Sequence, residues 1–221
     1  SGMFTMGKNV LRFENNFSKY ISKKYSVMVN SGSSANLLAL SSLFYKKKNP
    51  LKRGDEVLVT GVSWSTTYAP LQQLGLKLKL IDINLKNFNV DEDLLEKAIT
   101  KNTKLIVVVN LLGIPCDLNR IKKLCDKKKI YLFEDNCESM GAKIGKKKAG
   151  SYGELSSHSF FFSRSQQMKM THRLYHSATK LLALEKIRKI LPFLSAGRMT
   201  LITRPFEDKL LCYSQQSLLG P

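Results

Sequence analysis

Strand-like and helical segments alternate along the first 163 residues, and this alternation limits the fold more than any other feature of the chain. Short apolar runs such as 56–60 and 105–110 are separated by helical stretches of roughly ten residues. The run at 105–110 is almost continuously apolar, as expected for a parallel strand buried on both faces. We therefore predict an α/β domain with βαβ units and a mostly parallel sheet.

The pattern also predicts where each element lies. We expect helices at 10–24, 35–45, 66–74, 91–99 and 118–128, and strands at 25–29, 56–60, 77–82, 105–110, 130–133 and 158–162. After residue 163 the chain becomes rich in Lys and Arg, and we expect no further strand–helix alternation. Residues 181–194 could form a basic amphipathic helix.

Ligands of parallel sheets bind where strands end and helices begin. Four loops of this kind are expected here, at 30–34, 61–67, 110–113 and 134–141. The first is a Gly/Ser turn before a helix, whose backbone N–H groups could cradle a phosphate. The alternative is a tight turn with an ordinary serine N-cap.

Three single residues each allow a structural and a functional interpretation. Trp64, the only tryptophan, either stacks on a planar cofactor or packs in the core. Asp135 ends a buried strand, where its carboxylate either forms a salt bridge or holds a cationic ring nitrogen. His158 precedes a Ser-Phe run, and such a residue is more often packed or capping than an acid or base.

Charge and cysteine content exclude several classes. The formal net charge is +19, but the lysine runs at 46–48, 127–129 and 146–148 fall in turns and at element ends. They are not interleaved with aromatic residues, so we expect no nucleic-acid partner. No apolar run is long enough to span a membrane, and residues 1–3 do not begin a signal peptide, which predicts a cytoplasmic protein. The four cysteines show no metal-binding spacing, so we expect reduced thiols and no metal.

The ordered motifs identify a family. The chain carries VNSGSSANLL at 29–38, GDEV at 54–57, EDNCESMGA at 134–142, GSYGE at 150–154 and SFF at 159–161. Over about residues 7–163 it resembles the DegT/DnrJ/EryC1/StrS family of pyridoxal-phosphate (PLP) dependent sugar aminotransferases and dehydratases. NSGSSAN and EDNC resemble the CDP-4-keto-6-deoxyglucose 3-dehydratase branch most.

The resemblance implies the large domain of a fold-type-I PLP-dependent transferase, with three αβα layers. It implies a nucleotide-sugar substrate, a role in deoxysugar and lipopolysaccharide biosynthesis, a homodimer, and PLP or pyridoxamine 5'-phosphate as cofactor. Asp135 would pair with the protonated ring nitrogen, Trp64 would stack on the ring, and Glu138 would lie near the ring hydroxyl. The residues that the resemblance assigns to the phosphate are Gly32, Ser33, Ser34 and Ser159.

The resemblance also exposes a departure. The family's catalytic residue, a Schiff-base lysine in aminotransferases or a histidine base in dehydratases, falls at the position of Arg164. Arginine stays protonated, so it neither forms an imine nor accepts a proton. The glycine-rich segment that follows in the family, and its smaller C-terminal domain, are absent. We therefore expect an inactive or impaired enzyme, or alternatively a non-catalytic fold-type-I protein that binds PLP or a nucleotide sugar.

Two further expectations follow from this departure. Residues 164–221 form a divergent basic tail, which is either a truncated or frame-shifted reading or the end of a genuine degenerate paralogue. Cys137 matches one ligand position of the iron–sulfur subgroup of dehydratases, but the other closely spaced cysteines are absent. We therefore expect no cluster.

Overall fold

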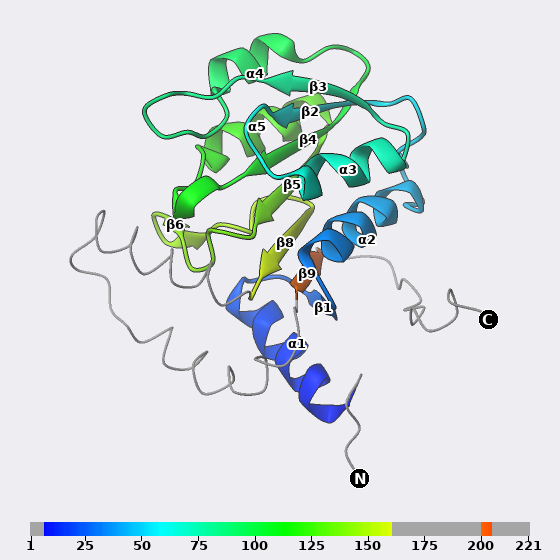
Figure 1. The fold of residues 1–221 in the computed structure, drawn as a ribbon, viewed down its shortest axis with the longest axis vertical. Coiled ribbons are helices and arrows are strands. Elements are labelled where there is room, and N and C mark those ends of the chain that lie inside the picture. The colour runs from blue at the N-terminus through cyan, green and yellow to red at the C-terminus, as the bar shows by residue number, and fades with distance from the viewer. Residues whose placement is uncertain (1–6, 161–199, 205–221) are drawn as a thin grey trace.

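The computed structural model describes residues 7–160 and the backbone of 200–204. Its main feature is a seven-stranded sheet in the order β1-β9-β8-β5-β4-β2-β3 (Figure 1). The strands are β1 Tyr25–Val29, β2 Glu56–Thr60, β3 Lys77–Ile81, β4 Thr103–Val109, β5 Tyr131–Asn136, β8 Leu155–Ser159 and β9 Thr200–Arg204. The helices are α1 Lys8–Tyr20, α2 Gly32–Phe44, α3 Ser65–Gln73, α4 Glu92–Ala98 and α5 Leu118–Lys128, with a short hairpin of β6 Lys143–Ile144 and β7 Lys147–Lys148.

Neighbouring strands from β8 to β3 are all paired in parallel, which confirms the predicted α/β fold. β9 is antiparallel to both of its neighbours, β1 and β8. Consequently β1 runs in the same direction as β8, and the carboxyl ends of β1, β2, β4, β5 and β8 share one edge of the sheet. This edge is where the predicted loops lie.

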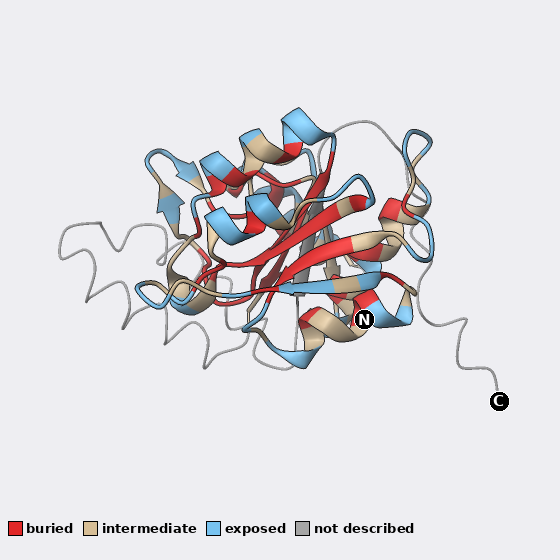
Figure 2. Ribbon diagram, turned by 90° about the horizontal axis from the view of Figure 1, so that it is seen from above, coloured by how far each residue is buried: buried red, intermediate tan, exposed pale blue. Residues whose placement is uncertain are grey.

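Helices cover both faces of the sheet, and its central strands β2, β4, β5 and β8 are largely buried (Figure 2). On one face, α2 and α3 pack on side chains such as Val57, Val107 and Phe133. On the other face, α5 packs on Leu58, Ile106 and Leu132. Consecutive strand residues point to opposite faces, so neighbouring residues of one strand enter two separate layers.

Most predicted boundaries agree with the structure to within two residues, but four elements differ by more. The first helix ends at Tyr20 instead of residue 24, and β5 extends to Asn136 instead of residue 133. The helix expected to start at residue 35 begins at Gly32, because the Ser31 side chain caps it by accepting a hydrogen bond from the Ser34 N–H. The strand expected at 158–162 runs from Leu155 to Ser159. Its Ser-Ser-His core has no apolar pattern and yet is completely enclosed.

One strand, β9, follows residue 163, and the sequence pattern did not predict it. β9 supplies the strand between β1 and β8, so the sheet includes residues from the C-terminal part of the chain. Its sequence, TLITR, contains the β-branched residues that favour strands. The basic composition around it obscured this signal.

Candidate functional site

Hydrogen bonds join three of the predicted loops, and the helix α2 that follows the fourth, at the carboxyl edge of the sheet. Asn36 of α2 and Thr67 of α3 both donate to Asp135 at the end of β5. Trp64, just before α3, donates to Glu138, which lies in the loop after β5. Glu138 also accepts a hydrogen bond from the loop that follows β4. The loops predicted from the strand ends therefore meet in one place.

Asp135 is the centre of this arrangement. Its side chain is almost completely enclosed, with only 3% of the residue exposed. Its Oδ2 accepts hydrogen bonds from Asn36 Nδ2 at 3.1 Å and Thr67 Oγ1 at 3.0 Å, and its Oδ1 accepts one from the Cys137 N–H at 3.1 Å. A buried carboxylate needs such partners to stay charged. No salt bridge to Asp135 occurs among the described residues, which disfavours the structural interpretation.

Trp64 lies at the mouth of this site and is 56% exposed, so the core-packing interpretation is wrong. Its Nε1 donates to Glu138 Oε1 at 3.2 Å, which fixes the plane of the indole. The second oxygen of Glu138, Oε2, accepts from the Leu112 N–H at 3.0 Å. Leu112 has a left-handed backbone with φ of 53°, and the Glu138 contact holds this loop in place.

The Gly/Ser turn forms the N-terminus of α2. Ser31 Oγ accepts from the Ser34 N–H at 3.2 Å and donates to Ser34 Oγ at 3.0 Å. The N–H groups of Gly32 and Ser33 lie in the first turn, where a helix offers no acceptor. They are therefore available to an anion, and the helix dipole favours one there.

Two predicted site residues lie at the end of the described range 7–160 or outside it. Ser159 is the last residue of β8 and is half-buried, on the same face of the sheet as Asp135. Arg164 lies outside the described residues. Its role therefore rests on the sequence alone.

The opposite face of β5 holds a second buried carboxylate, Glu134. Its Oε1 accepts from the N–H groups of Tyr152 and Gly153, and its Oε2 accepts from the Gly150 N–H at 2.6 Å. Burial raises the pKa of Glu134, although these backbone donors oppose the shift. All three hydrogen bonds to Glu134 come from backbone N–H groups of one loop, so Glu134 is a structural clamp.

His158 is buried on the same face as Glu134, as the packed interpretation predicted. Its Nε2 lies 3.2 Å from Ser156 Oγ, and its ring makes an edge contact with Phe17. Burial lowers the pKa of His158 to about 3. A Cβ added at Gly150, which has a φ of +89°, would lie 2.5 Å from the imidazole. This histidine therefore needs glycine beside it.

Sequence reasoning gave no role to Asn36 or Thr67. Both belong to segments that were singled out, but only a fold places them against Asp135. In the structure each is a polar residue at a buried helix position, 1% exposed for Asn36 and 2% for Thr67. A polar side chain facing a core needs a partner.

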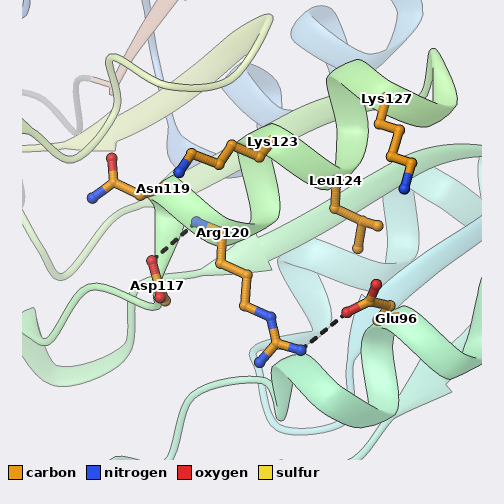
Figure 3. Close-up of a pocket in the computed structure, with 7 residues that line it drawn as sticks. All are labelled: Glu96, Asp117, Asn119, Arg120, Lys123, Leu124 and Lys127. Carbon is orange, nitrogen blue, oxygen red and sulfur yellow. Dashed lines mark hydrogen bonds and ion pairs between the residues drawn. The ribbon is translucent and has the colours of Figure 1, made fainter.

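A surface hollow on the α5 side of the molecule is a poor alternative site. It is lined by Glu96, Asp117, Asn119, Arg120, Lys123, Leu124 and Lys127 (Figure 3). Arg120 already forms ion pairs with Asp93 and Glu96 there. These side chains are largely exposed, and the hollow lies on the face opposite α2 and α3.

Residues 7–160 contain neither a candidate metal-binding cluster nor a helix able to span a membrane. Cys116, Cys125 and Cys137 are buried thiols, as expected, and Cys212 lies outside the described residues. Within the described part, no group of three or more Cys, His, Asp or Glu side chains could hold a metal ion. None of the helices described there has the length and apolar character needed to cross a membrane.

Comparison with known proteins agrees with the motifs. The model of the DegT/DnrJ/EryC1/StrS aminotransferase family matches residues 1–166. A GDP-4-keto-6-deoxy-D-mannose 3-dehydratase of Yersinia pseudotuberculosis is 55% identical over 74% of this chain and 42% of its own length. A GDP-perosamine synthase of Vibrio cholerae is 30% identical over 72% of this chain and 42% of its own length.

Solved structures agree as well. The structure of E. coli GDP-4-keto-6-deoxy-D-mannose-3-dehydratase with bound hydrated PLP has a TM-score of 0.74 and 40% identity, covering 92% of this chain and 45% of that one. The chain thus spans less than half the length of these relatives. Since the family model covers residues 1–166 of 221, the chain belongs to the DegT/DnrJ/EryC1/StrS aminotransferase family.

Proposed function

We propose that the chain is the cofactor-binding large domain of a PLP-dependent enzyme that modifies a nucleotide-linked 4-keto-6-deoxysugar. The observation that carries this proposal is the arrangement around Asp135, a buried carboxylate beside an exposed indole and a helix N-terminus. Asp135 would hold the ring nitrogen, Trp64 would stack on the ring, and Gly32, Ser33, Ser34 and Ser159 would bind the phosphate. When bound, PLP supplies an electron sink that stabilises a carbanion on the substrate.

Unsatisfied polar atoms support a ligand at this site. Three buried side-chain atoms have no hydrogen-bond partner among the described residues, and two of them, Asn36 Oδ1 and Ser157 Oγ, lie on the Asp135 face. Ser157 is directly opposite Asp135 in the register of β5 and β8. Buried polar atoms are almost always paired, so these two atoms could bind polar groups of a ligand that is not among the described residues.

Glu138 takes a modified role in this proposal. Both of its oxygens already accept hydrogen bonds, from Trp64 Nε1 and from the Leu112 N–H. It would therefore orient the indole first, and contact the ring hydroxyl through its remaining lone pairs.

Dehydration is the favoured chemistry. The relative at 55% identity is named a 3-dehydratase, whereas the perosamine synthase is 30% identical. The second candidate, binding without turnover, is favoured by Arg164, which cannot serve as base or imine former. In both cases we propose residues 1–163 as the PLP-binding part and 164–221 as divergent sequence, with β9 of that part completing the sheet.

Trp64 makes the test direct because it is the only tryptophan. PLP stacked on the indole should quench its fluorescence saturably, with one PLP per chain. Pyridoxal without the phosphate should quench far more weakly, because it cannot use the α2 N-terminus. Free N-acetyltryptophanamide titrated with PLP controls for inner-filter effects. Absence of saturable quenching by PLP, or equal quenching by pyridoxal, would overturn the cofactor proposal.

Borohydride then separates the two chemistries. We expect no reducible imine at position 164, while PLP binding persists. Turnover of GDP-4-keto-6-deoxy-D-mannose would then support dehydration, and its absence would support binding without turnover. An imine at a specific lysine would instead indicate an aminotransferase. The family resemblance implies a homodimer, which sedimentation velocity tests. The expected lack of nucleic-acid binding is tested by a salt titration with an oligonucleotide.

A further inference from the structure

The two oxygens of Asp135 are not equivalent. Oδ2 accepts two hydrogen bonds, from Asn36 Nδ2 and Thr67 Oγ1, whereas Oδ1 accepts one, from the Cys137 N–H. Each carboxylate oxygen has two strong in-plane acceptor directions. Among the described residues Oδ2 is therefore filled, and Oδ1 has one direction left.

The donors to Oδ2 are themselves anchored. The Asn36 amide donates its second proton to the Thr66 carbonyl at 3.1 Å, so its orientation is set by α3. The Thr67 hydroxyl accepts from Ser63 Oγ at 2.8 Å. Because that hydroxyl is already an acceptor from Ser63, its own proton is directed to Asp135. Both side chains are buried, so water does not compete for these bonds.

We propose that Asn36 and Thr67 are positioning residues that reserve Asp135 Oδ1 for a cationic ring nitrogen and keep the proton on that nitrogen. This inference rests on the proposed function. Hydrogen bonds to a carboxylate stabilise its charged form. Without one of these donors the charged carboxylate would be less stabilised and would hold a proton on a bound ring nitrogen less firmly. The electron sink that a protonated ring supplies would then be weaker.

The test uses the full chain and PLP labelled with ¹⁵N in the ring. Thr67→Val removes one donor at nearly constant shape, Asn36→Leu removes the other from a different helix, and Thr67→Ser keeps the hydroxyl. We expect the ¹⁵N chemical shift of a protonated ring in the wild type and in T67S. T67V and N36L should shift toward the unprotonated value and bind PLP on the order of tenfold more weakly, as expected for one charge-assisted hydrogen bond.

The outcomes separate this inference from the proposed function. Failure of the wild type to bind PLP would overturn the proposed function and this inference with it. Wild-type binding with an unchanged ¹⁵N shift in the folded T67V and N36L proteins would overturn only this inference, because a purely structural role lowers the melting temperature without moving the ring proton. If T67V does not fold, N36L and T67S decide the matter.

Discussion

Two adjacent carboxylates on β5 have opposite surroundings. Glu134 is completely enclosed and accepts three backbone N–H groups, all from the loop at 150–153. Asp135 points to the other face, accepts from two side chains and one backbone N–H, and keeps one acceptor direction of Oδ1. Strand alternation thus separates a structural acid from a candidate functional one within two residues. The two carboxylates differ in their donors. Backbone N–H groups hold Glu134 against one loop, whereas the side chains of Asn36 and Thr67 orient Asp135 in the candidate site.

The largest expected effect is a loss of stability when Glu134, the structural clamp, is replaced. Glu134→Ala leaves three buried N–H groups without acceptors, each worth about 1–3 kcal/mol, so unfolding free energy should fall by about 3 kcal/mol or more. Urea unfolding followed by circular dichroism measures it. Glu134→Gln, which keeps one oxygen, should lose less. A loss below about 0.5 kcal/mol for E134A would show that Glu134 is not a clamp.

The next effect is the pH dependence of stability that arises from His158, which lies on the same face of the sheet as Glu134. His158 has a pKa of about 3 in the folded chain, below its ordinary value of 6.5, so the unfolded chain binds more protons between these values. Stability should therefore fall as pH decreases from 6.5 toward 3, by about 3 kcal/mol at pH 4.

The comparison of wild type with His158→Gln isolates this effect from other groups on the face. Glu134 has a raised pKa and contributes the opposite slope above its ordinary range, and Lys23 has a pKa lowered to about 8 by burial. Both are present in the two proteins and cancel in the difference. Equal pH slopes in unfolding experiments would contradict a neutral buried imidazole.

The smallest effect concerns the rim of the Asp135 face. Glu138→Ala removes the acceptor of the Trp64 indole and of the Leu112 N–H, both in partly exposed loops. Stability should decrease by about 1 kcal/mol. The more informative readout is fluorescence anisotropy of Trp64, which should fall as the indole gains freedom. Unchanged anisotropy would mean that other contacts hold the ring.

Apolar patterns and the order of the motifs in the sequence predicted much of the fold. The strand at 56–60 and the helix at 118–128 have the predicted bounds. The strand is a short apolar run that follows a turn, and the helix has apolar residues at helical spacing. β8 and β9 were misplaced or missed because their identity depends on the sheet around them. A Ser-Ser-His segment becomes a strand only when β5 and β9 pair with it on both sides.

The candidate site, like the fold, was only partly predictable from the sequence. The sequence points to Asp135 by its place at a strand end and to Trp64 as the only tryptophan, in a loop of small residues. The structure links both to the predicted loops. Asn36 and Thr67 could not be selected, since their partner lies 99 and 68 residues away in sequence. The clamp by Glu134 was hidden for the same reason, because its donors begin 16 residues later on a loop with no periodic pattern.

The contrast between the two carboxylates has one decisive measurement. Glu134→Gln and Asp135→Asn make the same chemical change at adjacent residues, and PLP affinity of both can be read from quenching of Trp64. We predict that D135N binds PLP at least about tenfold more weakly than the wild type, whereas folded E134Q binds within about twofold of it. Wild-type affinity in D135N, or equal losses in both variants, would contradict the account.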